Sequence, residues 1–156
     1  MARGVVLFIA LGLVVGAGVI GWRFIGQSEK GAFFLRPDDV ALVALGAGLY
    51  ERECASCHGA QLEGQPNWRM RKADGRLPAP PHDQSGHTWH HPDEVLHALT
   101  KYGPAAVVGN DYETDMPAYE ELLSDEEITA VLSYIKSTWP QPIRERHDAI
   151  NQANRK

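Results

Sequence analysis

The chain has 156 residues, enough for one ordinary domain and a terminal segment. Apolar residues make up 44% of it and charged residues 22%, a composition that excludes a wholly disordered chain. The formal net charge is −5 and every acidic residue lies beyond residue 27, which argues against a nucleic-acid-binding protein. Two cysteines are too few for a disulfide framework.

An apolar run occupies residues 4–25 and is interrupted only by Arg23. About 20 apolar residues are needed to cross a bilayer, so this run predicts a single transmembrane helix. Arg3 precedes it, which places its start on the cytoplasmic side. The alternative is a cleaved signal peptide, although the run exceeds the usual core of about 7–15 residues and no A-x-A site follows it. Both alternatives predict that the rest of the chain is exported.

A short connector, residues 26–37, links this run to the rest of the chain. The stretch 27–37 spans at most ~36 Å when fully extended. Phe33, Phe34 and Leu35 are apolar side chains that disfavour such extension in water. We therefore expect the exported part to lie close to the bilayer.

Three later segments show helical patterns. The first, 37–53, begins with Pro and two Asp residues and continues with apolar residues at helical spacing. The second, 92–103, opens in the same way and ends near a glycine. The third, 124–139, is the clearest, because Ser124 and Glu127 have the spacing of a capping box and a proline follows the segment.

The remaining segments are predicted to be irregular. Residues 59–91 are rich in Gly, Pro and His, and a loop of this length is uncommon unless it wraps something. Residues 104–120 form a second expected loop, and residues 140–156 are expected to be a loose polar tail. No long stretch alternates between apolar and polar residues, so the sequence predicts a small all-α domain over residues 38–139.

The sequence Cys54-Ala55-Ser56-Cys57-His58 has the C-x-x-C-H spacing of covalent haem attachment. The two thiols add across the vinyl groups of a haem, and the adjacent histidine then lies beneath the iron as its proximal ligand. A zinc site would need more ligands, commonly a second cysteine pair, and a thioredoxin-like pair would need a βαβ setting. Neither is present in the sequence. A covalent haem would also stabilise a small domain that has no disulfides.

The second axial ligand of such a haem is usually methionine or histidine. Met1 starts the apolar run, and Met70 lies among arginine and lysine residues in a segment expected to be wet. Met116 precedes Pro117 on the loop before the last predicted helix, which makes it our candidate ligand. The alternative is that Met116 packs in a core and that the iron is open or bound by histidine.

These motifs occur in an order that resembles class I (mitochondrial-type) mono-haem cytochromes c, here in a membrane-anchored bacterial form. The elements that carry the resemblance are Gly46-x-x-x-Tyr50-x-x-x-Cys54-x-x-Cys57-His58-Gly59, Ala79-Pro80, Asp115-Met116-Pro117-Ala118, Leu123-Ser124-Asp125-x-Glu127-Ile128 and Tyr134-Ile135.

The resemblance implies three or more helices around one haem c, with the first and last helices crossing. It implies that Gly46 lets the last helix approach closely, with Tyr134 as its neighbour. It also implies that a proline carbonyl accepts a hydrogen bond from His58, which fixes the ring and makes it a better ligand. Pro80 is the candidate for this carbonyl, and Pro81 is the alternative.

Five histidines lie between His82 and His97, most of them in the run Gly86-His87-Thr88-Trp89-His90-His91. One hypothesis is a second metal such as copper, which imidazole suits. The other is a polar loop over the haem edge whose histidines form hydrogen bonds. We favour the second, because no cysteine, methionine or carboxylate is clearly spaced to complete a metal site.

The resemblance further implies a carrier of single electrons rather than an enzyme, since His/Met-ligated iron has no open position. We expect it at the bacterial inner membrane with its haem domain in the periplasm, exchanging electrons with a redox protein or membrane respiratory complex. The short connector favours a fixed subunit over a soluble shuttle. The alternatives are a ligand-binding haem protein and a metal-handling role for the histidine-rich loop.

A run of acidic residues flanks Met116 and either docks on a basic partner or is simply solvated at a loop and helix start. The sequence leaves both interpretations open for Asp111, Glu113, Asp115, Glu120, Glu121, Asp125, Glu126 and Glu127.

Overall fold

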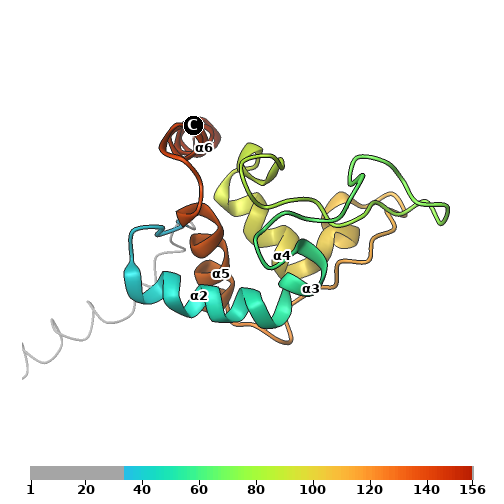
Figure 1. Ribbon diagram of the computed structural model, residues 1–156, viewed down its shortest axis with the longest axis horizontal. Helices are drawn as coiled ribbons and strands as arrows, with labels where there is room; N and C mark the ends of the chain where they lie inside the picture. Colours follow the sequence, from blue (N-terminus) through green and yellow to red (C-terminus); the bar gives the residue numbers. More distant parts are fainter. Residues whose placement is uncertain (1–33, 156) are drawn as a thin grey trace, which may run out of the picture. The chain divides into compact units, whose positions relative to one another are not determined.

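The computed structural model describes residues 34–155 (Figure 1). Its elements are helical, as the sequence predicts, and no β-strand occurs within that range. In chain order they are α2 (Val40–Glu53), α3 (Ala55–His58), the 3-10 turn η1 (Thr88–His90), α4 (Asp93–Val108), α5 (Asp125–Ser137) and α6 (Gln141–Asn154).

The predicted membrane helix at residues 4–25 lies outside the described residues, as does most of the connector 26–37. From residue 34 to residue 155, no helix has the length and apolar character needed to span a bilayer.

Side-chain caps fix the starts of the two helices that form the core. Asp39 is extended and accepts a hydrogen bond from the Leu42 amide at 3.1 Å, so α2 begins at Val40 rather than at residue 37. The capping box of α5 is confirmed. The Ser124 hydroxyl accepts from the Glu127 amide at 3.3 Å, and the Glu127 carboxylate accepts from the Ser124 amide at 2.9 Å.

Helices α2 and α5 cross at Gly46 (Figure 1). A Cβ atom at this position would lie 2.0 Å from the Ala130 carbonyl oxygen and 3.0 Å from Cβ of Tyr134. Only glycine therefore allows the two backbones to approach this closely. The expected roles of Gly46 and Tyr134 agree with this geometry.

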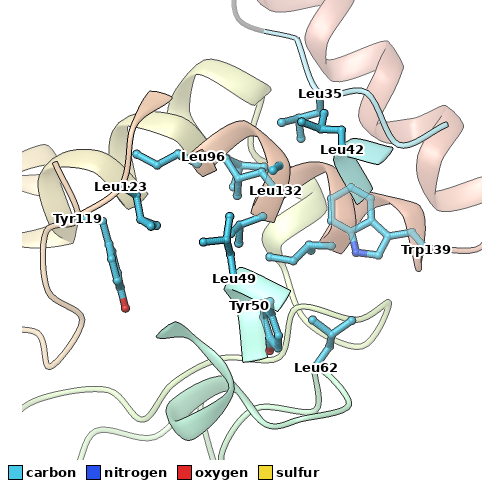
Figure 2. Packing of buried hydrophobic residues seen from close by; sticks show 14 residues of the cluster. Leu35, Leu42, Leu49, Tyr50, Leu62, Leu96, Tyr119, Leu123, Leu132 and Trp139 are labelled. Atoms are coloured by element: carbon cyan, nitrogen blue, oxygen red, sulfur yellow. The ribbon is translucent and has the colours of Figure 1, made fainter. Parts of the chain in front are cut away.

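The apolar core surrounds this crossing and draws on every long helix up to Trp139 (Figure 2). Ile128, Val131 and Ile135 of α5 are almost completely buried, with Leu49 and Tyr50 of α2 against the same cluster. Burial of apolar surface is the main source of stability in such a small domain.

Helix α4 continues five residues beyond the end expected from the sequence. Gly103 has φ 78° and ψ 152°, a left-handed conformation that favours glycine, and a short helical segment resumes at Pro104 and ends at Val108. The expected helix end at Gly103 is therefore a kink, and the following loop begins at residue 109.

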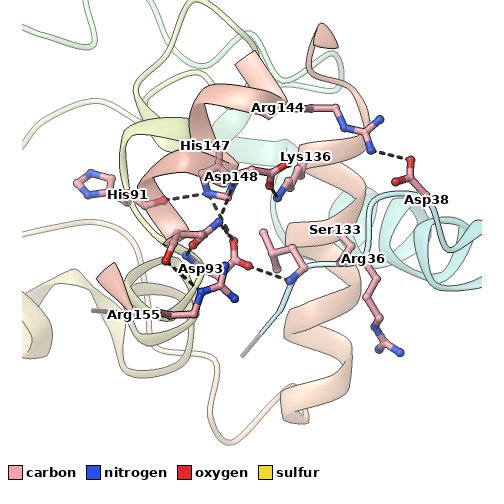
Figure 3. A network of polar contacts seen from close by, with 12 residues as sticks. Arg36, Asp38, His91, Asp93, Ser133, Lys136, Arg144, His147, Asp148 and Arg155 are labelled. Carbon is pink, nitrogen blue, oxygen red and sulfur yellow. Dashed lines mark hydrogen bonds and ion pairs between the residues drawn. The ribbon is translucent and has the colours of Figure 1, made fainter. Parts of the chain in front are cut away.

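The expectation of a loose tail at residues 140–156 is wrong, because residues 141–154 form helix α6. Its inner face is polar, with His147 fully buried and Asn151 nearly so. Asn151 donates to the Asp93 carboxylate at 3.0 Å and accepts from the Asp93 amide at 2.7 Å. His147 donates through Nε2 to the His91 carbonyl at 3.0 Å (Figure 3).

The same carboxylate of Asp93 also holds the beginning of the described chain. It accepts from the Leu35 amide at 3.0 Å, and the next amide, of Arg36, donates to the buried Ser133 hydroxyl at 2.9 Å (Figure 3). The end of the connector and residues of α6 thus share one buried polar centre on α4.

We predict that Gly46→Ala loses about 1–3 kcal/mol of unfolding free energy, because its methyl group overlaps the Ala130 carbonyl and the helices must separate. Chemical denaturation of the holoprotein measures this loss.

The control is Gly48→Ala on the same helix, where the added Cβ would meet only an Arg52 guanidinium nitrogen at 3.5 Å. Alanine is the better helix former, so this change should gain up to about 1 kcal/mol. Equal effects of the two substitutions would contradict the close approach at Gly46.

Candidate functional site

The C-x-x-C-H segment is placed by the junction of two helices. Cys54 ends α2, with its amide donating to the Tyr50 carbonyl at 2.9 Å, and begins the single turn of α3. Cys57 lies one turn later, which puts the two side chains on neighbouring positions of the same helix face. Gly59 ends the turn at φ 82°.

Both cysteines are free thiols. Burial first, and the nearby Glu53 and Cys57 second, raise the pKa of the half-buried Cys54 thiol to about 11. Cys54 packs against the core, and Cys57 is more exposed.

His58 is buried and its Nδ1 lies 2.8 Å from the Pro80 carbonyl oxygen. A carbonyl only accepts, so Nδ1 carries the proton and Nε2 keeps its lone pair, which is the tautomer that a metal needs. Burial lowers the pKa of His58, against the opposing effect of the Pro80 carbonyl, and so favours this neutral ring. The alternative, Pro81, instead accepts from the Thr88 hydroxyl at 3.4 Å.

Two buried tyrosines brace the motif at its two ends. The Tyr50 hydroxyl donates to the Gly59 carbonyl at 2.9 Å, and the Tyr119 hydroxyl donates to the Glu53 carbonyl at 2.8 Å. Burial raises the pKa of Tyr119 to about 12, which keeps it a donor. Sequence reasoning missed Tyr119, whose only signal was its position three residues after Met116.

Met116 packs against the buried core, whereas Met70 is 67% exposed. The loop of Met116 is tied down by its neighbour Asp115, which accepts from Lys72 at 2.5 Å and from Arg76 at 2.8 Å. These contacts hold the pKa of Asp115 below its ordinary value. The structure therefore leaves Met116 as the candidate ligand and places Met70 in solvent.

The histidine-rich loop uses its rings mainly in stacking. His87 stacks on Trp68 at 5.3 Å between centroids, and His90 stacks on Trp89 at 3.6 Å. Within residues 34–155, no group of three or more His, Cys, Asp or Glu side chains is arranged to hold a metal ion. The geometry gives the second-metal hypothesis no support.

Half of the acidic run has partners inside the protein. Asp115 pairs with Lys72 and Arg76, and Asp125 accepts from Lys101 at 2.7 Å. Glu126 pairs with an arginine and Glu127 belongs to the capping box. The other four members of the acidic run are Asp111, Glu113, Glu120 and Glu121. Within residues 34–155 their carboxylates make no ion pair or hydrogen bond.

These residues fit a covalently attached haem. Two free thiols lie one helical turn apart, and the adjacent imidazole has a protonated Nδ1 and an available Nε2. Cys54, Ala55 and Met116 all pack against the apolar core, which supplies the cover that such a group needs. When bound, haem iron supplies reversible one-electron oxidation and reduction.

A protein-family model described as Cytochrome c matches residues 43–139, more than half of the chain. Comparisons with curated proteins and with solved structures gave no match. The matched segment contains the C-x-x-C-H motif, Pro80, Met116, most of α2 and all of α5, and it ends before α6 begins. The chain therefore belongs to the cytochrome c family, and its domain binds haem c covalently as a haem-based electron carrier.

Proposed function

We propose that this protein is a class I mono-haem cytochrome c anchored in the bacterial inner membrane by residues 4–25. Its haem domain lies in the periplasm and carries single electrons to or from a membrane respiratory complex. The observation that carries this proposal is the long apolar run at residues 4–25. A short connector follows this run, and at Leu35 the chain is already hydrogen-bonded to the folded domain.

In this proposal Cys54 and Cys57 form the thioether bonds, and His58 and Met116 are the axial ligands. Pro80 orients His58 through the contact at 2.8 Å. With both axial positions filled, the chain has no place for a substrate at the iron. The buried side of the motif excludes water, which suits electron transfer because little solvent must reorganise.

The tether limits where the domain can exchange electrons. Leu35 and Arg36 are hydrogen-bonded to α4 and α5, so only residues 26–34 remain between the anchor and the fixed chain. Such a segment spans at most ~30 Å. A partner must therefore offer its docking site low over the bilayer, as a neighbouring membrane complex would.

Met116→Ala should abolish the weak red absorption band of methionine-ligated ferric haem. It should also let the reduced protein bind carbon monoxide at neutral pH, because the iron then has an open position. Absorption spectra before and after carbon monoxide measure both effects. Met70→Ala is the control, since its side chain is exposed and should change neither. A Met116→Ala protein that keeps the band would refute this ligand.

Anchoring is tested on the full-length chain expressed in a bacterium with haem attachment. We expect the holoprotein to stay in the membrane fraction after an alkaline wash, and its intact mass to include residues 4–25. About 20 apolar residues partition into the bilayer too strongly for such a wash to remove. A soluble holoprotein that lacks this segment would show a cleaved signal instead.

The four carboxylates of the acidic run that form no ion pair or hydrogen bond within residues 34–155 are the candidate docking charges. The double variant Glu120→Gln/Glu121→Gln should weaken the ionic-strength dependence of haem oxidation by inner-membrane vesicles. The unmodified protein should lose roughly tenfold in rate between low and physiological salt. Glu145→Gln removes a charge from α6 as the control. A flat salt dependence of the unmodified protein would exclude steering by these charges.

A further inference from the structure

His82 lies directly against the ring of His58. The two imidazole centroids are 4.0 Å apart and the ring planes differ by only 24°. Pro80, two residues earlier on the same loop, bonds Nδ1 of His58 at 2.8 Å. One loop therefore fixes the same imidazole twice, by a hydrogen bond at its edge and by a stacked ring on its face.

The ring of His82 is itself held in place. Its Nδ1 lies 2.8 Å from the Thr88 hydroxyl, so the side chain has a polar partner that defines its plane. Its amide donates to the Leu62 carbonyl at 2.8 Å, and its carbonyl accepts from Trp139 Nε1 at 2.7 Å. Thr88 therefore holds the imidazole itself, and two other segments hold the backbone that carries it.

The support behind Trp139 comes from α6, which lies outside the segment matched by the family model. The fully buried His147 ring packs edge-on against the Trp139 indole, with centroids 5.1 Å apart and planes at 78°. Contacts thus run without a break from α6 through Trp139 and His82 to His58. This gives the polar C-terminal helix a structural connection to the haem-binding motif.

His82 presents the face of its ring to His58, since the two ring planes differ by only 24°. An aromatic face is electron-rich and polarisable, so it stabilises a facing ring that becomes more positive when a bound iron is oxidised.

We propose that His82 is a positioning residue that fixes the plane of the His58 imidazole, with Thr88 and Trp139 holding it in place. The proposal rests on His58 being an axial ligand. The plane of an axial imidazole sets the magnetic anisotropy of low-spin ferric iron, and its surroundings tune the reduction potential. Both properties report on His82 independently of any electron-transfer partner.

The test compares His82→Leu and His82→Phe in the full-length holoprotein by electron paramagnetic resonance, proton NMR of the haem methyl groups and redox titration. His82→Leu should change the g values and the spread of the methyl shifts, because leucine presents no flat ring to His58. It should also raise the midpoint potential, since the polarisable face that stabilises the oxidised form is gone. His82→Phe keeps a flat ring and should retain the spectra of the unmodified protein.

Thr88→Val should shift the spectra in the same direction as His82→Leu, because it removes the partner of His82 Nδ1 while keeping the shape of the side chain. If His82→Leu yields no holoprotein, the spectra of Thr88→Val alone test the proposal. His90→Leu is the control, since that ring is exposed and stacks only on Trp89. It should leave the spectra and potential unchanged.

If His82→Leu and Thr88→Val had the same spectra as the unmodified protein, the proposal would be overturned, since Pro80 alone would then fix His58. Equal shifts in the leucine and phenylalanine variants would also overturn it. Failure of the proposed axial ligation would look different, because the unmodified protein itself would then lack the low-spin spectrum of a histidine-ligated haem.

Discussion

The contact between the backbones of α2 and α5 at Gly46 is the constraint on which the rest of the structure depends. The end of α2 delivers the two thiols and His58, the loop before α5 carries Met116, and Trp139 lies two residues after the end of α5. An added methyl group at Gly46 would lie 2.0 Å from the Ala130 carbonyl oxygen, so this spacing permits no side chain. Because Gly46 has no side chain, the two helices can approach closely, and this spacing sets the relative position of the candidate haem-binding residues that they carry.

A buried polar centre at Asp93 supplements this apolar core. Its carboxylate receives hydrogen bonds from Leu35 and Asn151 and lies 3.5 Å from His147. Burying a charge is costly unless its oxygens are satisfied, and here several donors from two ends of the chain satisfy them. Loss of any one of these donors would leave a buried carboxylate oxygen without a hydrogen bond. The centre therefore holds α6 and the first described residues in one arrangement.

Local signals predicted much of this fold, and non-local contacts account for what they missed. The capping box at Ser124 and the C-x-x-C-H motif are short patterns with a direct physical meaning, and both were placed from sequence alone. Helix α6 was missed because its buried face carries His147 and Asn151, which resemble solvated residues until Asp93 is brought beside them. The roles of Tyr119 and His82 likewise depend on residues at least 24 positions away, Glu53 and His58, and no local pattern predicts such pairings.

The histidine-rich loop, for which the sequence favoured hydrogen-bonding histidines over a second metal, uses its rings in stacking and in hydrogen bonds. His87 and His90 stack on tryptophans, His91 supplies a carbonyl to His147, and His82 covers His58. A flat ring that is itself hydrogen-bonded holds a neighbouring ring in one plane, which a flexible aliphatic side chain would not do. In the proposed ligation by His58, an imidazole held on both edge and face would change little in position when the iron changes charge, and small rearrangement is what rapid electron transfer requires.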